Sequence, residues 1–271
     1  MTTTAKQPGF GKTFGGNAAE NYERYFVPAI GRPLAIDLIA AAALQAGERV
    51  LDVACGTGVV TRLAAEQVGP GGSVAGADLT ANMLEVARSA APPKSGIQWY
   101  ETSAEAMPLP DHAFDVVFCQ LGLQFVADKA AAVREMYRVL APGGRVLVTV
   151  PTPSRFFGVF EQALARHVPA AAPFVALVFS LNDPAALEQL FRDARFKDVT
   201  TRSTPKKLHL PPPREFFWQY VRCTPISGLV EEADPQVRAA LEREVVEGWR
   251  EWATDGGMTY DQPMLWGTGR K

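Results

Sequence analysis

The feature that most constrains the fold is a short apolar segment that ends in a glycine turn, residues 49–58. Asp52 lies inside the apolar run, and Gly56 and Gly58 follow it. A glycine turn lacks Cβ atoms, so a ligand can lie against its backbone. A second apolar segment ends in Asp78, twenty residues after Gly58, where a carboxylate can accept hydrogen bonds from ribose hydroxyls. The pattern predicts a strand, a turn and a helix that form a site for an adenosine-type cofactor.

Short apolar strands alternate with helical patterns from residue 49 onward. The predicted strands are 49–54, 73–78, 97–102, 114–119 and 145–150, and the predicted helices are 59–68, 82–91 and 128–140. Ala141-Pro-Gly-Gly144 closes the last of these helices. Such alternation predicts an α/β fold with a parallel sheet covered on both faces. Ligands of these sheets bind beyond the carboxyl ends of the strands, which is where the glycine turn falls.

The two ends of the chain have other patterns. Residues 1–16 are polar and rich in Thr and Gly, which predicts a mobile tail without a signal peptide. We expect a short helix from Ala18 to Phe26, interrupted by Pro28 and Gly31, and a second helix from Pro33 to about Ala43. After Pro151 the sequence predicts a Phe- and Ala-rich segment 152–180, a helix near 184–193, strands at 197–203 and 206–210, a connector at 211–213, a helix at 235–253 and a final strand at 259–268.

Composition argues against several classes of partner. The 271 residues are 47% hydrophobic and carry a net charge of −2, which gives no electrostatic reason to bind nucleic acid or an anionic membrane. No apolar segment reaches the length of a membrane span. Three cysteines lie far apart without a C-x-x-C pair, which is typical of a reducing cytoplasm and predicts neither a disulfide nor a metal site.

A dinucleotide is the first alternative for the cofactor. Gly56-x-Gly58 followed by Asp78 fits a nicotinamide enzyme tolerably well. Three observations argue against it. Thr61 stands where the third small residue is expected, Asp52 lies in a strand that is usually apolar there, and no Tyr-x-x-x-Lys pair is present for hydride transfer.

The segment 50–58, Val-Leu-Asp-Val-Ala-Cys-Gly-Thr-Gly, resembles the first motif of class I S-adenosylmethionine-dependent methyltransferases. The resemblance continues in order through 76–88, 103–110, 114–120 and 135–147. It points to the subgroup that contains the ubiquinone and menaquinone C-methyltransferases, also called methyltransferase type 11.

This resemblance implies a Rossmann-like sheet of seven strands, mostly parallel with the last strand antiparallel, flanked by helices and covered by a helical cap. The implied organisation is a tail at 1–16, a helical lid at 17–44, a cofactor-binding core at 45–151, cap helices with late core strands at 152–257, and a final core strand at 258–271.

The same resemblance assigns the cofactor contacts. Asp52 would orient the ammonium end of the methionine portion, and the backbone of 54–58 would approach it. Asp78 would hold the ribose hydroxyls, Cys119 and Gln120 would lie beside the amino acid part, and Tyr22 would serve as a lid. The full set is Tyr22, Asp52, Ala54, Gly56, Thr57, Gly58, Asp78, Leu79, Met83, Ser103, Ala104, Glu105, Cys119 and Gln120.

At the adenine, Leu79 and Met83 would contact the ring and 104–105 would border its edge. Ser103 stands where the subgroup usually has Asp, and a hydroxyl is a less selective partner for the exocyclic amine. Purely structural roles remain open for two residues. Asp52 is also suited to capping the turn, and Met83 to packing within its helix.

No catalytic base is identified. His112 lies in a polar turn, whereas His167 and His209 lie in the less constrained half of the chain and are candidates. Cys55 and Cys119 lack a neighbouring cation and are better interpreted as small buried residues. The aromatic segments 156–179 and 216–220 together predict a cap over an apolar substrate.

The sequence therefore predicts a cytoplasmic enzyme that transfers a methyl group from S-adenosylmethionine to a small apolar metabolite, at oxygen or carbon, with S-adenosylhomocysteine as product. No metal is expected, and the oligomeric state stays open. The alternatives are a non-catalytic S-adenosylmethionine-binding protein and an NAD-dependent oxidoreductase.

Overall fold

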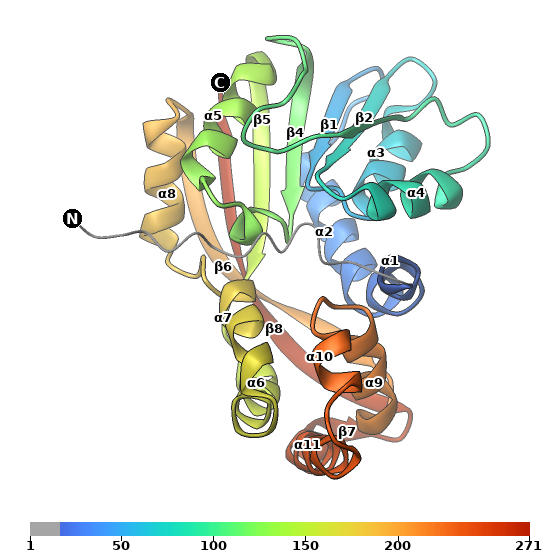
Figure 1. The fold of residues 1–271 in the computed structure, drawn as a ribbon. Coiled ribbons are helices and arrows are strands. Elements are labelled where there is room, and N and C mark those ends of the chain that lie inside the picture. The colour runs from blue at the N-terminus through green and yellow to red at the C-terminus, as the bar shows by residue number, and fades with distance from the viewer. Residues whose placement is uncertain (1–16) are drawn as a thin grey trace.

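A twisted sheet forms the centre of the molecule in the computed structural model, which describes residues 17–271 (Figure 1). The predicted tail, residues 1–16, lies outside the described residues. The strands follow the order β3-β2-β1-β4-β5-β8-β6, and a two-residue strand, β7, also pairs with β8. Their bounds are β1 Arg49–Val53, β2 Ser73–Asp78, β3 Gln98–Glu101, β4 Phe114–Gln120, β5 Leu140–Pro151, β6 Lys197–Leu210, β7 Ala253–Thr254 and β8 Gly257–Arg270.

Only the last strand runs against the others. The pairs from β3 to β5 are parallel, and β8 is antiparallel to both of its long neighbours, β5 and β6. The central strands are apolar and buried because helices cover both faces of the sheet. The predicted Rossmann-like fold with an antiparallel last strand is confirmed.

Helices from different parts of the chain cover the two faces. Helices α2 (Arg32–Ala42) and α3 (Val59–Val68) pack on one face through Leu38, Ala64 and their neighbours. Helices α5 (Lys129–Val139) and α8 (Pro184–Asp193) pack on the other through Met136 and Phe191. A further helix, α4 (Ala81–Ala90), packs beside β2 and β3 near the sheet edge. Both layers bring loops to the carboxyl ends of the parallel strands.

The N-terminal helix is not interrupted where the sequence predicted. Helix α1 (Ala18–Asn21) continues through a π-helix, η2 (Tyr22–Gly31), directly into α2. Pro28 lies inside η2, and the Arg32 amide donates to the Val27 carbonyl. A proline ring clashes with the preceding turn of an α-helix, and the wider π-helical turn accommodates it. The run Ala18–Ala42 is also the one stretch of the described residues that is apolar and long enough to cross a membrane, which is weak evidence because its helices pack in the core.

The second half of the chain forms a lobe below the sheet (Figure 1). Strands β6 and β8 both extend beyond the end of β5 into this lobe. Its helices are α6 Arg155–His167, α7 Ala172–Val178, α9 Pro213–Arg222, α10 Ser227–Glu231 and α11 Pro235–Gly248, with short 3₁₀ turns η4 Pro169–Ala171 and η5 Trp249–Trp252. Another 3₁₀ turn, η3 Leu123–Phe125, follows β4. The lobe therefore shares two strands with the sheet.

Two predictions in this half are wrong in detail. The separate strands at 197–203 and 206–210 are one strand, β6, with Pro205 paired opposite Pro263. Proline is tolerated there because β6 is an edge strand. An edge strand has no neighbour on one side, so the N–H that proline lacks is not needed for a ladder bond on that side. The predicted connector at 211–213 ends in Pro213, which begins α9 in the position that proline favours.

Aromatic side chains build the core of the lobe. Phe156 stacks on Trp249 with ring centroids 4.7 Å apart and on Tyr260 at 4.1 Å. The Trp249 indole donates to the Phe156 carbonyl at 2.9 Å, so its only polar atom is paired. Leu241 and Val245 of α11 are fully buried beside Trp249. The helix predicted at 235–253 therefore packs into this core, although α11 ends at Gly248 and η5 follows it.

Candidate functional site

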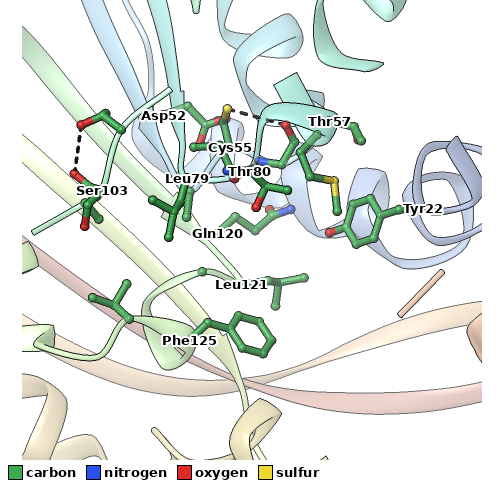
Figure 2. Close-up of a pocket in the computed structure, with 18 of the residues that line it drawn as sticks. Tyr22, Asp52, Cys55, Thr57, Leu79, Thr80, Ser103, Gln120, Leu121 and Phe125 are labelled. Carbon is green, nitrogen blue, oxygen red and sulfur yellow. Dashed lines mark hydrogen bonds between the residues drawn. The ribbon is translucent and has the colours of Figure 1, made fainter. Parts of the chain in front are cut away.

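A cavity of about 290 Å³ lies at the carboxyl ends of β1, β2 and β4 (Figure 2). Strands β1 and β4 are neighbours, but the chain first continues from β1 to β2 and β3 on the other side. The sheet order therefore reverses between β1 and β4, and open α/β sheets bind ligands at such a point. The loops that leave these two strands shape the cavity.

Two non-glycine residues at the strand ends have left-handed backbone conformations. Ala54 after β1 and Leu121 after β4 both have φ of 55°, and both border the cavity. Gly122 lies against Ala54 so closely that a Cβ on Gly122 would come within 2.5 Å of the Ala54 Cβ. Such conformations are strained and persist where the surrounding structure fixes them, often at binding sites. Here they turn both loops at the mouth of the cavity.

Asp52 is buried in β1 and is bonded to the start of α3. Its Oδ2 accepts from the Thr61 amide at 3.1 Å and from the Thr61 hydroxyl at 2.6 Å. Burial raises the pKa of Asp52 from its ordinary value of 3.8 to about 7, against the effect of these hydrogen bonds. The carboxylate therefore occupies part of the positive helix terminus that would otherwise attract an anion.

Asp78 ends β2 and fixes the glycine turn. Its Oδ2 accepts from the Gly56 amide at 2.8 Å, and its Oδ1 accepts from the Thr80 amide at 2.9 Å. Burial raises the pKa of Asp78, and these two amides counteract the rise. Leu79, the next residue, is half exposed and borders the cavity, as a residue that lies against a ligand would be. A carboxylate held in this way keeps lone pairs for hydroxyl donors.

The loop after β3 forms the far wall of the cavity, opposite Tyr22 (Figure 2). The Ser103 hydroxyl accepts from the Glu105 amide at 3.2 Å and lies 3.3 Å from the Glu105 carboxylate. Glu105 in turn accepts from the Asp128 amide at 2.7 Å, at the start of α5. Ser103 thus stabilises the turn, and Glu105 ties the loop to α5.

The charge of the cavity fits a cationic cofactor and not a dinucleotide. Among the described residues that border it, the charged ones are Asp52, Asp78 and Glu105, and none is Lys, Arg or His. A pyrophosphate would face three carboxylates and a helix terminus already bonded to Asp52. S-adenosylmethionine instead brings a sulfonium and an ammonium group.

Two buried polar atoms of residues on the cavity wall are also available to bind a ligand. Thr57 Oγ1 and Gln120 Oε1 have no hydrogen-bond partner within residues 17–271, although both residues border the cavity. The Gln120 amide nitrogen donates to the Gly31 carbonyl at 3.0 Å, which leaves its oxygen facing away from η2. Buried polar atoms are seldom left unpaired, so a ligand with hydrogen-bond donors fits here. The residues present are therefore suited to S-adenosylmethionine.

The structure brings most of the predicted cofactor residues to this one cavity. Those that border it are Tyr22, Asp52, Ala54, Gly56, Thr57, Asp78, Leu79, Met83, Ser103, Ala104, Glu105 and Gln120. Gly58 and Cys119 do not. A Cβ on Gly58 would meet the Trp99 ring at 2.5 Å, and Cys119 is fully buried in the sheet. Gly58 is thus required by packing, whereas Gly56 borders the cavity.

The sequence did not predict that the loop after β4 borders this cavity, and it placed the segment 156–179 over the substrate rather than beside the cofactor. Leu121, Gly122 and Phe125 follow β4, and Phe174 and Leu177 come from α7. The residues after β4 have a signal in the sequence, since that strand ends beside β1. Helix α7 lies in the predicted aromatic cap, but its position beside this cavity depends on how the lobe packs.

The three histidines do not border this cavity. His167 pairs with Glu244 at 2.9 Å between α6 and α11, and His209 contacts Thr259 on exposed strands. His112 contacts the Leu140 carbonyl in its turn. In the described part of the chain, no three His, Cys, Asp or Glu side chains are grouped as metal ligands.

A second, apolar cavity of about 90 Å³ adjoins the first. The two share Tyr22, Leu121, Phe125 and Phe174. Tyr22, Leu121 and Phe125 lie on the side of the larger cavity away from Ser103 (Figure 2). Phe157, Phe179 and Tyr220 of the predicted aromatic cap border it, whereas Phe160 and Phe217 are buried elsewhere in the lobe. The prediction of an aromatic cap thus holds for a subset of these side chains.

Comparison with known proteins points to the same class. A family model described as a methyltransferase domain matches residues 51–148. The ubiquinone/menaquinone biosynthesis C-methyltransferase UbiE of Hahella chejuensis is 42% identical over 127 residues, which are 44% of this chain and 51% of that protein. The demethylmenaquinone methyltransferase of Lactococcus lactis is 35% identical over 170 residues, 56% of this chain and 67% of that protein. The chain thus spans between half and two thirds of the length of these relatives.

Solved structures share the fold at low identity. Phosphoethanolamine N-methyltransferase 2 of Haemonchus contortus, in complex with S-adenosyl-L-methionine, superposes with a TM-score of 0.60 and 19% identity, over all of this chain and 61% of that one. The YcgJ protein of Bacillus subtilis gives a TM-score of 0.55 and 19% identity, over 88% and 98% of the two chains.

The fold, the acidic cavity at the switch point and these relatives agree on one class, the S-adenosylmethionine-dependent methyltransferases. The chain belongs to the class I S-adenosylmethionine-dependent methyltransferases, in the subgroup that contains the ubiquinone and menaquinone C-methyltransferases.

Proposed function

We propose that this chain transfers the methyl group of S-adenosylmethionine to a small, largely apolar metabolite, at an oxygen or a carbon atom. The observation that carries the proposal is the contact between two unlike cavities. One is acidic and suited to the cofactor, and the other is apolar and adjoins it at Tyr22 and Leu121. The quinone-pathway names of the relatives agree with an apolar acceptor.

The cofactor, when bound, supplies an activated methyl group on its sulfonium sulfur. Asp78 would hold the ribose, while Asp52 and Gln120 would orient the methionine end. The aromatic residues around the apolar cavity would place the acceptor and exclude water. Positioning of two reactants alone lowers a barrier by about 7–11 kcal/mol in well-oriented systems.

We further propose a cytoplasmic protein that acts on a small molecule. The three cysteines are free and buried, as expected in a reducing compartment. The acidic cavity gives no electrostatic support for nucleic acid as a substrate.

The test of the cofactor site is Asp78→Ala. A carboxylate that accepts from ribose hydroxyls contributes charged hydrogen bonds, so the variant should bind S-adenosylhomocysteine about 10- to 100-fold more weakly in calorimetry. Asp261→Ala is the matched control, because Asp261 is an exposed acid of β8 paired with Lys207 at 3.2 Å, and it should bind normally. Equal affinity of D78A and wild type would remove Asp78 from the site.

Turnover tests the activity itself. The wild-type protein is incubated with S-adenosylmethionine carrying a labelled methyl group and a panel of small apolar metabolites. Label transferred to any acceptor, with release of S-adenosylhomocysteine, supports the enzyme. Binding of the cofactor without transfer to any member of a panel that covers hydroxyl and carbon acceptors supports a non-catalytic binding protein.

A further inference from the structure

Gln124 is a buried amide on the wall of the apolar cavity with half of its hydrogen bonding unmet. The residue is 1% exposed, and its Nε2 donates to the Leu121 carbonyl at 2.9 Å. Its Oε1 has no partner in the part of the chain that the structure describes. The Leu121 carbonyl fixes the orientation of the amide, because the reverse orientation would place two oxygens together. The side-chain oxygen of Gln124 is thus a hydrogen-bond acceptor that no described residue pairs with a donor.

Several other polar groups around this cavity are already paired. The Thr224 hydroxyl donates to the Val221 carbonyl at 2.9 Å. The Gln262 amide donates to the carbonyls of Thr152 and Pro263, and its oxygen accepts from the Tyr260 hydroxyl at 3.1 Å. Of the buried side-chain nitrogens and oxygens along this wall, within residues 17–271, Gln124 Oε1 is the one left unpaired.

The cavity also lacks charge. Its described lining contains no Asp, Glu, Lys, Arg or His side chain. Burial raises the pKa of Tyr220, Tyr260 and Cys223, so these groups stay neutral near pH 7. A charged ligand would lose its hydration here without compensation. At about 90 Å³ the cavity is smaller than the engineered cavity of about 150 Å³ that holds benzene, so its occupant is one ring or less, with the remainder in the neighbouring cavity.

We propose that Gln124 selects the methyl acceptor: a neutral, apolar molecule that places a hydroxyl or N–H donor against Gln124 Oε1. This inference rests on the proposed function, since it names the chemistry of the acceptor for that site. A substrate that lacks a hydrogen-bond donor leaves the buried Gln124 oxygen unpaired. Such a substrate therefore binds less favourably than one that carries the donor.

The test compares phenol and toluene, two rings of similar size that differ in the donor. Both are titrated in calorimetry against protein saturated with S-adenosylhomocysteine, for wild type and for Gln124→Met. A neutral hydrogen bond in a protein is worth about 0.5–1.5 kcal/mol, so Q124M should bind phenol about 2- to 10-fold more weakly. Toluene affinity should stay unchanged or rise, because methionine preserves the apolar volume.

Thr224→Val is the matched control, because its hydroxyl lines the same cavity but is already paired, and it should leave the ratio of phenol to toluene affinity unchanged. Equal effects of Q124M on both probes would overturn the inference. Binding of S-adenosylhomocysteine alone is measured in a separate titration. If the protein does not bind it, this result counts against the proposed function and not against the role of Gln124.

If Q124M does not fold, the wild-type protein labelled with ¹³C at the glutamine side-chain carbonyls gives the same answer. Phenol should shift the Gln124 carbonyl resonance downfield, as a new hydrogen bond does, and toluene should not. Identical shifts with both probes would again contradict the selection of a donor.

Discussion

Asp52 combines two roles at the residue scale. Its bonds to Thr61 join β1 to α3, which is the structural role that the sequence left open. It also borders the cofactor cavity, and burial places its pKa at about 7, where a nearby cation changes its ionisation most easily. The same carboxylate therefore stabilises the turn and, under the proposed function, would make cofactor binding sensitive to pH.

Binding of S-adenosylhomocysteine should strengthen as the pH rises from 6 to 7.5. Without ligand the Asp52 pKa is raised to about 7, so the carboxyl is largely protonated at pH 6. The ammonium of the ligand favours the ionised form, so binding releases a proton and affinity rises by at most about tenfold per pH unit. Asp52→Asn keeps an acceptor for Thr61 but cannot ionise. Calorimetry should show that the ratio of wild-type to D52N affinity rises with pH, and a constant ratio would contradict the role.

At the scale of elements, the turn between β1 and α3 is held by an aromatic ring. Trp99 of β3 lies over both Gly58 and Gly76, where added Cβ atoms would come within 2.5 Å and 2.6 Å of its ring. Gly58 also has φ of 82°, which disfavours other residues. This glycine therefore serves the packing of β3 against the turn that carries the proposed cofactor residues.

Gly58→Ala should destabilise the protein more than Gly143→Ala does. Gly143 has nearly the same φ, 81°, but nothing lies within 4 Å of an added Cβ, so it reports the backbone strain alone. Overpacking against Trp99 should add about 1–3 kcal/mol to the loss in G58A, measured by urea unfolding. If both variants lose the same free energy of unfolding, Trp99 does not constrain the turn.

The elements differ in how well the sequence predicts them. Helix 59–68 and helix 184–193 have the bounds predicted, because their apolar spacing and flanking residues are local signals. The π-helix at Tyr22–Gly31 and the unbroken strand through Pro205 are not predictable in this way, since tertiary packing overrides what proline signals locally. For the site, the strand ends predict Asp52 and Asp78, whereas the position of Phe174 depends on how the lobe folds against the sheet.

At the scale of the whole molecule, one apolar core joins the sheet to the lobe. The cluster that includes Leu38 and Val60 beneath the sheet continues through Phe156 and Trp249 in the lobe. The two parts should therefore unfold together, and the lobe should not melt as a separate unit.

Trp249→Ala should lower the free energy of unfolding by about 3–5 kcal/mol, because the ring is fully buried and stacks on Phe156. Trp252→Ala is the control, since this partly buried ring meets Phe156 only edge-on, and it should lose less. Circular dichroism and tryptophan fluorescence should give one coincident urea transition for both variants. Two separate transitions would show that the lobe folds independently.

Strand β8 has a consequence for how a substrate enters. It pairs with β5 from Arg270 to Met264 and continues beside β6, and its residues Tyr260, Gln262 and Met264 border the apolar cavity. A hinge motion between sheet and lobe would have to break ladder hydrogen bonds along this strand. Motion that widens the acceptor cavity would instead involve segments outside the sheet that border it, such as η2 with Tyr22 and α7 with Phe174. The enzyme would then admit its substrate by the local motion of a helix, while the two halves stay rigidly joined.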